Sequence, residues 1–462
     1  MSGQVLMAGA AEVDITPAPG TQIAGNIGVV RPVKEIVDRL YARALVLEQG
    51  GERLCVLSTD VLAIRTDYSD EIRRRAHERF GLDPACVMVH CTQNHHSPSV
   101  GHCFCLDEAF WRRYVPPGLD WILGGDARYN ELFIGGVMDA IAGALARMRP
   151  VHLKAGRAVE GRISFNRRCI LRDGTAVMHP PVCDPRIVQV EGPMDPEVSL
   201  LVLEGEDGRR VAALMHFSCH PDHWVGQYTV AGGWPGAWCE GMRAALGDGA
   251  VPMVVNGCCG NLHARNPIAP VFPDYREMGR VLTEDAVKIL GALEDVSSDG
   301  AALGRRRKML RIPLRELDPA TVEAARSLLA GHPEPMWADE AKTRVEWEWV
   351  YAVSMLDLAA HRARQPWHDY EVQAFRIGGA ALLALVGEPF AEGQLEIKLG
   401  SPAAYTQVAH MSNGYVGYVP TRAAIARGGF ETRAAHWSKL APEALETIAR
   451  ESLAMLKELF GS

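Results

Sequence analysis

The nine residues from Cys91 to Ser99 read Cys-Thr-Gln-Asn-His-His-Ser-Pro-Ser, and they decide how the rest of the chain is interpreted. The run just before them, from Ala85 to His90, is apolar and contains two valines, which predicts a short buried strand. The polar cluster therefore begins where a strand ends, and this is where ligands and catalytic groups gather in α/β proteins. The adjacent imidazoles of His95 and His96 can bind a metal or move protons there, although an isolated pair more often only hydrogen-bonds to the backbone.

The same pattern recurs along the chain. Five strand-like segments end in polar loops, and a sixth loop carries a phenol. The residues concerned are Asp60, His95 with His96, His220 with His223, Asn261 with His263, Glu388 and Tyr415. Imidazole, carboxylate and phenol groups that converge from separate strands can hold a zinc ion and leave a position for water. Bound zinc lowers the pKa of that water to about 7 and polarises a carbonyl group, which permits hydrolysis near neutral pH.

Each of these loops, taken singly, also has a purely structural explanation. His220 can be a turn histidine after a core strand, the segment 257–260 can be a tight glycine turn, and Glu388 can stand at a helix entry that favours a carboxylate. The paired Arg167 and Arg168 are typical of exposed charge or, close to a site, of residues that hold a carboxylate or phosphate. Only the combination of loops makes an active site the better interpretation.

Length, composition and charge narrow the class of protein. With 462 residues, of which 48% are hydrophobic and 23% charged, the chain has ordinary globular composition and is long enough for one large or two smaller domains. The 48 basic and 56 acidic residues give a net charge of −8, which argues against a nucleic-acid partner. With a nucleic-acid partner disfavoured, we expect the protein to bind a small-molecule substrate.

Targeting signals and cysteines predict a cytoplasmic protein. The segment from Met1 to Ala11 lacks the basic and apolar regions of a signal peptide. No apolar stretch approaches the roughly 20 residues that a membrane-spanning helix needs. The eleven scattered cysteines are odd in number and suit a reducing compartment better than a disulfide framework.

Alternating strand and helix patterns predict an α/β fold, in which helices surround a mixed β-sheet core. Two glycines at 50 and 51 predict a hairpin between strands at 39–47 and 53–58. Helices are predicted at 69–80, 130–148, 274–290, 337–365 and 439–460. The helical stretch 315–366 is interpreted as a subdomain or insertion within a single domain that spans 1–462. The irregular stretch 101–130 is typical of a segment that lines or covers a site.

Taken in order, these segments resemble the neutral, non-lysosomal ceramidase family and its shorter bacterial relatives. An Asp-Ile-Thr opening, a Leu-Tyr-Ala-Arg-Ala strand and an Asn-x-Tyr-x-x-Tyr loop all occur, and a Thr-His-Thr-His-Ser-Gly-Pro loop is replaced by Thr92 to Pro98. The matching segments are 12–17, 40–44, 92–98, 219–222, 260–264, 386–389 and 413–418. No single motif is highly specific, but their shared order is, and it extends from Glu12 to Thr432.

The resemblance carries expectations about chemistry and architecture. The family uses zinc to hydrolyse an amide bond, so the resemblance implies metal ligands at His220, Glu388 and Tyr415. It also implies a ceramidase-like catalytic domain without the C-terminal β-domain of the long ceramidases, because the chain stops one helix after the Tyr415 loop. Since no signal peptide is expected either, ceramide itself is not the expected substrate.

Two departures from the family's pattern bear on the metal. Alignment on Pro98 puts Gln93 where the family has a zinc-binding histidine, and it puts His95 where the family has a histidine associated with the oxyanion. His263 stands where ceramidases carry a serine near the reacting centre. The metal could therefore be retained with His95 or His263 as a replacement ligand, or it could be weakened or lost.

The sequence thus predicts a zinc-dependent hydrolase that cleaves an amide C–N bond, or an ester or lactone, of a small polar molecule. The assigned roles are metal binding by His220, Glu388, Tyr415 and His95, proton transfer or oxyanion stabilisation by His95, His96 or His263, and substrate binding by Arg167, Arg168, Asn261 and His223. The alternatives are a metal-free hydrolase or lyase that uses its histidines as acid and base, and a ligand-binding pseudoenzyme. Neither the substrate nor the oligomeric state follows from the sequence, and a homo-oligomer is left open.

Overall fold

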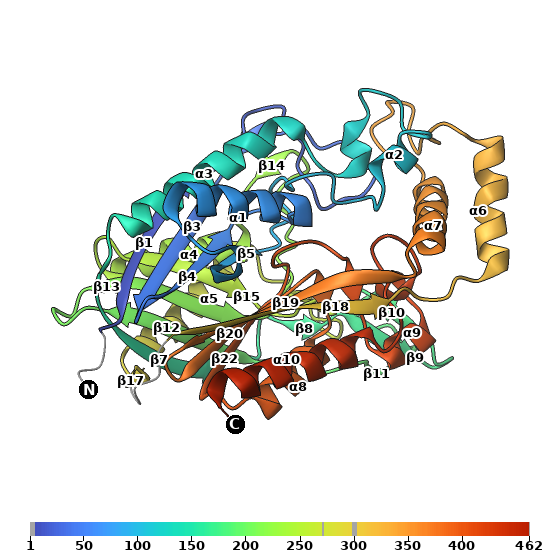
Figure 1. Cartoon of the computed structure of the whole chain (residues 1–462). Coiled ribbons are helices and arrows are strands. Elements are labelled where there is room, and N and C mark those ends of the chain that lie inside the picture. Colours follow the sequence, from blue (N-terminus) through green and yellow to red (C-terminus); the bar gives the residue numbers. More distant parts are fainter. Residues whose placement is uncertain (1–4, 270–271, 298–302, 462) are drawn as a thin grey trace.

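A computed structural model describes residues 5–269, 272–297 and 303–461 and has an α/β fold with three main sheets (Figure 1). The first sheet has the strand order β5-β4-β3-β1-β6. Its strands are β1 (Met7–Asp14), β3 (Tyr41–Gln49), β4 (Glu52–Thr59), β5 (Val87–Cys91) and β6 (Arg149–Pro150). The predicted mixed sheet is therefore present, because β5 runs parallel to β4 whereas the other neighbours are antiparallel.

The second and third sheets repeat this arrangement. The second has the order β15-β13-β12-β7-β17, and the third has the order β18-β19-β20-β22. Their strands are β7 (His152–Val159), β12 (Glu197–Glu204), β13 (Arg210–Phe217), β15 (Val251–Asn256) and β17 (Glu294–Asp295), then β18 (Gly304–Pro313), β19 (Trp367–Ile377), β20 (Ala380–Leu385) and β22 (Tyr405–Ala409). Each sheet is antiparallel except for one parallel pair at its edge, β13 with β15 and β20 with β22.

The carboxyl ends of these three edge strands are joined by hydrogen bonds between sheets. The backbone amide of Cys91, at the end of β5, donates to the carbonyl of Met411 at 3.2 Å. The amide of His410, just after β22, donates to the carbonyl of Asn256 at the end of β15, also at 3.2 Å. The amide of Asn413 donates to the carbonyl of Val89 at 2.8 Å. The loops that follow the three parallel pairs therefore meet at one place.

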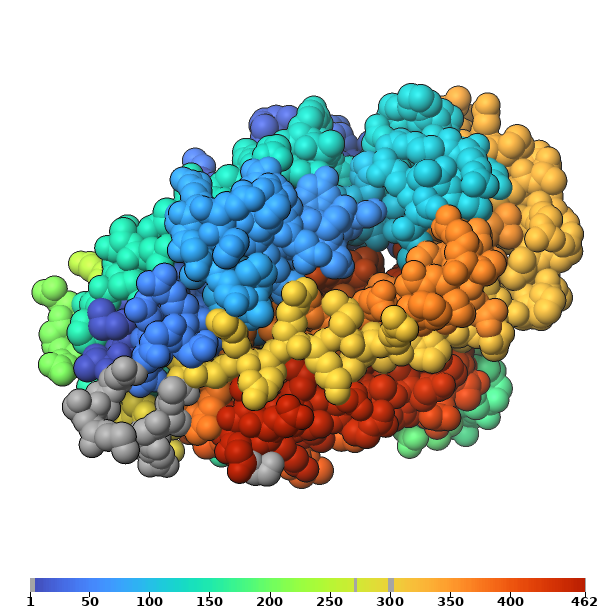
Figure 2. Space-filling model, viewed as in Figure 1, coloured from blue at the N-terminus to red at the C-terminus, as the bar shows by residue number. Residues whose placement is uncertain are grey.

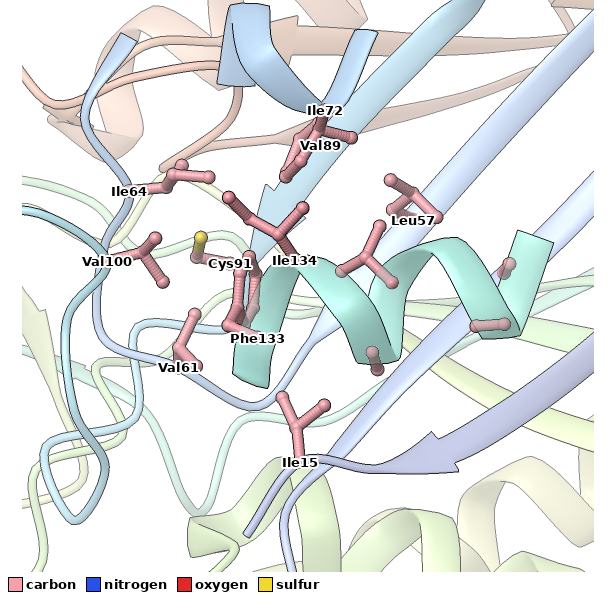
Figure 3. Close-up of a cluster of buried hydrophobic side chains, with 14 of the residues drawn as sticks. Ile15, Leu57, Val61, Ile64, Ile72, Val89, Cys91, Val100, Phe133 and Ile134 are labelled. Carbon is pink, nitrogen blue, oxygen red and sulfur yellow. The ribbon is translucent and has the colours of Figure 1, made fainter. Parts of the chain in front are cut away.

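Helices cover the outer faces of the sheets. The longer ones are α1 (Thr66–Phe80) and α3 (Ala127–Leu145) on the first sheet, α4 (Gly233–Leu246) and α5 (Tyr275–Leu290) on the second, and α8 (Ala391–Gly400) and α10 (Ala444–Phe460) beside the third. Figure 3 shows the core between α3 and the first sheet, where Ile134 of α3 lies near Val89 of β5 and Phe133 lies near Cys91. This burial of apolar side chains stabilises the layer.

Two more helices stand apart from the sheets at one end of the molecule (Figure 1). α6 (Pro319–Gly331) and α7 (Trp347–Arg364) pack on each other and on the segment of the short helix α2 (Glu108–Trp111). Their shared core includes Trp111, Leu329 and Trp349. Figure 2 shows the surface hollowed between the cyan segment that contains α2 and the orange α7. The 315–366 helical subdomain and the single domain over 1–462 stay predictions.

Local signals in the sequence account for several element boundaries. Gly50 and Gly51 have φ values of 65° and 84° and connect β3 to β4, as expected of a tight hairpin turn. Gly81, with φ of 68°, ends α1. Other boundaries differ: α1 begins at Thr66, three residues before the prediction, and the helix predicted from position 337 begins only at Trp347.

Several short strands and turns were not predicted. A three-stranded sheet contains β9 (Arg168–Leu171), β10 (Ala176–Met178) and β11 (Ile187–Val190). Three two-stranded ladders pair β2 (Glu35–Ile36) with β14 (Thr229–Val230), β8 (Phe165–Asn166) with β16 (Leu262–His263), and β21 (Glu388–Pro389) with β23 (Tyr418–Val419). The remaining short elements are α9 (Arg422–Arg427), η1 (Pro84–Cys86), η2 (Asp120–Leu123) and η3 (Phe430–Thr432). No helix among the described residues has the length and apolar character needed to cross a membrane.

Candidate active site

A cavity of about 220 Å³ lies where the loops after the parallel strands meet. Its polar wall carries Gln93 and His95 from the loop after β5, His220 from the loop after β13, and Glu388 from the segment after β20. Tyr415, from the loop after β22, completes it. The structure therefore brings the four predicted metal ligands together. Gln93, which stands where the resemblance implies a zinc-binding histidine, lies beside them.

The two imidazoles of the polar wall face each other. The Nε2 atoms of His95 and His220 lie 2.9 Å apart, so one ring donates a hydrogen bond to the other. Burial lowers the pKa of His95 to about 4 and lowers the pKa of His220 well below its usual value. Both rings are therefore neutral at pH 7. The Nδ1 atom of His95 has no hydrogen-bond partner in the described parts of the chain, and the nearest carboxylate oxygen, on Asp222, lies 4.0 Å away.

Glu388 is a buried carboxyl group held next to a phenol. The hydroxyl of Tyr415 donates to Glu388 Oε1 at 3.1 Å. Burial raises the pKa of Glu388 to about 7, although the guanidinium of Arg167 opposes the shift. Gly387 precedes it with φ of 72°, and a side chain there would approach the carbonyl of Gly417 to 2.5 Å. A glycine is therefore required for the turn that presents this carboxyl group.

The two arginines predicted to anchor a substrate have different positions. Arg167 lines the cavity, donates through Nε to Glu431 Oε1 at 2.8 Å and donates through Nη2 to the hydroxyl of Tyr418 at 3.2 Å. Arg168 does not line it and instead pairs with Glu191 and with Glu431 Oε2, the latter at 2.7 Å. Both arginines are buried, so they are not exposed charge. The carboxylate that both arginines bind is therefore that of Glu431 and not that of a substrate.

Gln93 fills part of the polar wall in an uncommon backbone conformation. Its φ is 67°, which a residue other than glycine rarely adopts, and such strain tends to occur at functional sites. The thiol of Cys259 lies 3.4 Å from the amide oxygen of Gln93. The amide also faces the carboxyl group of Glu388 and helps to lower the pKa of that group.

The other predicted site residues lie around the cavity rather than on its wall. The ring nitrogens of His96 face the carbonyl oxygens of Thr229 and His223, so this ring supports the loop backbone. The side chain of Asn261 bonds to the amide of Ala391 and to Glu392. The sequence therefore did not distinguish groups that contact the cavity from groups that hold its loops.

His223 and His263 do not line the cavity. The ring nitrogens of His223 are buried without hydrogen-bond partners in the part of the chain that the structure describes. The ring of His263 lies 6.5 Å from the ring of His220 and 4.5 Å from the ring of His179, measured between centroids. His263 is therefore in contact with residues of the cavity wall but is not itself part of it.

His179 is a site residue that the sequence analysis missed. It follows β10 in the unpredicted three-stranded sheet, lines the cavity and has φ of 50°. Burial lowers its pKa to about 4. The one local signal is the His-Pro-Pro sequence, which predicts only a turn. Asp222, which also lines the cavity, likewise follows a proline in a loop where only the histidines were singled out.

Zinc is the metal that the resemblance implies, and the donors fit zinc in kind. His95 and His220 direct their Nε2 atoms at each other, and Glu388 Oε2 is buried without a hydrogen-bond partner among the described residues. Neutral imidazoles and a carboxylate are common zinc ligands. Within the described ranges, however, no three His, Cys, Asp or Glu side chains form a group that could hold a metal ion. The two histidines and Glu388 alone therefore do not form a ligand set, and the phenol of Tyr415 is the further donor beside them.

Comparison with known proteins identifies the fold. No family model matches the sequence, and no curated protein matches it. Among solved structures, the chain is similar to two ceramidases, which shows that it shares their α/β fold. The neutral ceramidase from Pseudomonas aeruginosa matches with a TM-score of 0.71 and 19% identity, over 99% of this chain and 75% of that one. A ceramidase complexed with C2 matches with a TM-score of 0.72 and 18% identity, over 99% and 76%.

The match confirms two of the predictions. The chain has the neutral ceramidase fold over nearly its whole length, so the predicted ceramidase-like architecture is correct. The predicted α/β fold class is also correct, and about a quarter of the Pseudomonas chain has no counterpart in this sequence. At this level of identity the match establishes the fold, and the chemistry has to be argued from the site itself.

Proposed function

We propose that this protein is a hydrolase that cleaves the C–N bond of a small amide, or the corresponding bond of an ester or lactone. One observation carries the proposal: a neutral imidazole pair, a carboxyl group with a pKa of about 7 and a buried guanidinium group all border one cavity of about 220 Å³. Perturbed pKa values that gather in a cleft are characteristic of catalytic sites. The ceramidase fold supports the same class of reaction.

Each group of the polar wall has a role in this reaction. Glu388, with its pKa near 7, can accept a proton from the attacking water, and the phenol of Tyr415 orients the carboxyl group. Arg167 supplies positive charge for the oxygen of the tetrahedral intermediate. The neutral pair of His95 and His220 can pass a proton toward the leaving amine, because one ring nitrogen of the pair accepts while the other donates.

Zinc is part of this proposal as the expected cofactor. His95, His220, Glu388 and Tyr415 would hold it, and it would supply a more acidic water and a polarised carbonyl group. A metal-free hydrolase is the second candidate. It is favoured by the direct contact between the two Nε2 atoms and by the guanidinium of Arg167, which already brings positive charge to the cavity. We further propose a reducing, cytoplasmic setting, which fits the eleven cysteines, all of them free.

The decisive experiment compares wild type with His220→Ala and with His152→Ala, an exposed histidine outside the cavity. A panel of small amides, esters and lactones is screened for hydrolysis by mass spectrometry, and the metal content of each protein is measured. We expect turnover in wild type and His152→Ala, and its loss in His220→Ala.

The same measurements separate the candidates. About one equivalent of zinc that is absent from His220→Ala supports the zinc-dependent form, because a site that loses a ligand loses affinity. Turnover that persists after chelation supports the metal-free form. A blank screen with zinc supplied contradicts the hydrolase and leaves the ligand-binding pseudoenzyme.

A further inference from the structure

We infer that the aromatic part of the cavity wall is a subsite for a compact, neutral, planar ring, so that the substrate is a small aromatic amide or ester. This inference rests on the proposed function and adds the substrate class. The aromatic wall consists of Trp347, Tyr418, Phe430 and Trp437, which line the same cavity as the polar wall. They come from α7, β23, η3 and the loop after η3, elements outside the three parallel pairs.

The four rings form one connected surface. Trp437 lies 5.1 Å from Trp347 and 5.8 Å from Phe430, and Phe430 lies 5.9 Å from Tyr418 in an edge-on arrangement, measured between centroids. These separations are typical of attractive ring pairs. A further planar ring that enters the cavity can therefore add edge and face contacts of the same kind, which a flexible alkyl chain cannot match.

The aromatic wall is fixed before any ligand arrives. Glu431 follows Phe430 directly, is fully buried and accepts from both Arg167 and Arg168. The indole nitrogen of Trp437 donates to the carbonyl of Phe430 at 3.4 Å. A site held in its binding conformation does not lose affinity to the ordering of its own side chains.

The size of the cavity limits the ligand. An apolar cavity of about 150 Å³ holds benzene, whereas sites for drug-sized ligands measure roughly 300–1,000 Å³. At about 220 Å³, this cavity can contain one ring together with the amide group under attack. A long alkyl chain would extend beyond the cavity.

The charge of the surroundings disfavours a cationic ligand. Aromatic walls can also bind ammonium groups, because the ring face is negative. Here the guanidinium of Arg167 lies 5.5 Å from the centroid of the Tyr418 ring and already uses that face. A second cation would be repelled, so a neutral ring is the expected occupant.

Tyr418 sets how close the ring lies to the scissile bond. Its hydroxyl accepts from Arg167, and it also faces the carboxyl group of Glu388, whereas its ring packs on Phe430. The aromatic and polar walls therefore meet at one side chain. A ligand whose ring touches the aromatic wall has room for only a short connection to the bond that is cleaved.

The test uses substrates that have the same leaving group and differ in the acyl group. N-Methylbenzamide, N-methylcyclohexanecarboxamide and N-methylheptanamide contain the same number of carbon atoms, and the corresponding methyl esters extend the set. We expect kcat/KM for the benzoyl compounds to exceed that for the heptanoyl compounds about three- to tenfold, the value of one added aromatic contact. Equal rates, or a preference for heptanoyl, would overturn the inference.

Variants assign the preference to the aromatic wall. Trp347→Leu and Phe430→Leu each keep an apolar side chain but remove a ring, so the benzoyl-to-heptanoyl ratio should fall toward one in whichever of them folds. Trp224→Leu is the matched control, because Trp224 is 85% exposed and does not line the cavity. A ratio that stays at the wild-type value in both wall variants would contradict the assignment.

Binding separates failure of the inference from failure of the proposed function. If none of the compounds is hydrolysed, the hydrolase proposal fails, and the binding of benzamide and heptanamide to the wild-type protein is compared by calorimetry. Tighter binding of benzamide, reduced in Trp347→Leu, supports the ring subsite independently of catalysis. Equal or reversed affinities overturn it.

Discussion

The polar wall and the aromatic wall border the same cavity but are supported in different ways. The polar wall stands on loops that leave the parallel strand pairs, and hydrogen bonds between sheets hold those strand ends together. The aromatic wall is carried by elements outside the three main sheets, and the ion pairs of Glu431 hold it. The main sheets therefore position the proposed catalytic side chains, whereas the elements outside them determine which substrate group can bind next to those side chains.

The largest expected effect tests the polar wall. Glu388→Gln removes the proton acceptor but keeps the shape of the side chain, so kcat/KM should fall about 10²- to 10⁴-fold. The control is Glu396→Gln, an exposed carboxylate on α8, which should keep wild-type activity. Steady-state kinetics on the best substrate of the panel measures both. Retained activity in Glu388→Gln would remove this group from the mechanism.

The next effect tests the support of the aromatic wall. Glu431→Gln leaves the buried Arg167 and Arg168 without their shared carboxylate, and breaking a buried ion pair costs about 3–5 kcal/mol of unfolding free energy. Glu446→Gln, whose half-exposed carboxylate lies 3.7 Å from Arg422, should cost no more than about 1 kcal/mol. Denaturant unfolding monitored by circular dichroism compares the two. Similar losses in both would show that the aromatic wall does not depend on this cluster.

The raised pKa of Glu388 predicts how the free energy of unfolding changes with pH. Its pKa is raised from 4.5 to about 7, so the folded state holds a proton that the unfolded state releases over this range, and stability falls as pH rises through it. The loss amounts to about 3 kcal/mol above pH 7. Glu388→Gln should remove it, and the variant should therefore gain stability over wild type at pH 8 but not at pH 4. Unfolding in chelator at both pH values measures this, and a gain independent of pH would contradict the assigned pKa.

The smallest expected effect concerns the metal. Gln93→His restores an imidazole beside Glu388 and should raise zinc affinity at least about tenfold, because metal sites respond strongly to each added donor. Gln227→His, an exposed position, is the control for adventitious binding. Competition with a zinc indicator measures both. Unchanged affinity in Gln93→His would show that the polar wall no longer has the geometry of a zinc site.

The polar wall could largely be predicted from the sequence, whereas the aromatic wall could not. His95, His220, Glu388 and Tyr415 each follow an apolar run that ends abruptly in polar residues, and this local pattern is enough to place a loop at a strand end. No local pattern brings Phe430 to Trp347, because their contact depends on how α7 packs against a distant loop.

The same reason explains the errors at single residues. Arg167 and Glu431 are 264 positions apart, and nothing near either residue indicates the other. His179 belongs to short strands interrupted by turns, for which a helix or strand period cannot be recognised. His96 and Asn261 were correctly associated with the loops, but their contact with backbone rather than with the cavity depends on the final packing.

The hydrogen bond between the end of the first sheet and the loop after the third has a consequence for biosynthesis. The side chain of Asn413 accepts from the amide of Val89, 324 positions earlier in the chain. At roughly 5–20 residues per second, a ribosome needs some tens of seconds to make the intervening segment. For most of that time a nascent chain has the histidine loop but not Glu388, and Tyr415 is made only after Asn413. The proposed hydrolase activity should therefore be absent until translation is nearly finished, and its recovery after dilution from denaturant should follow the slowest long-range folding step.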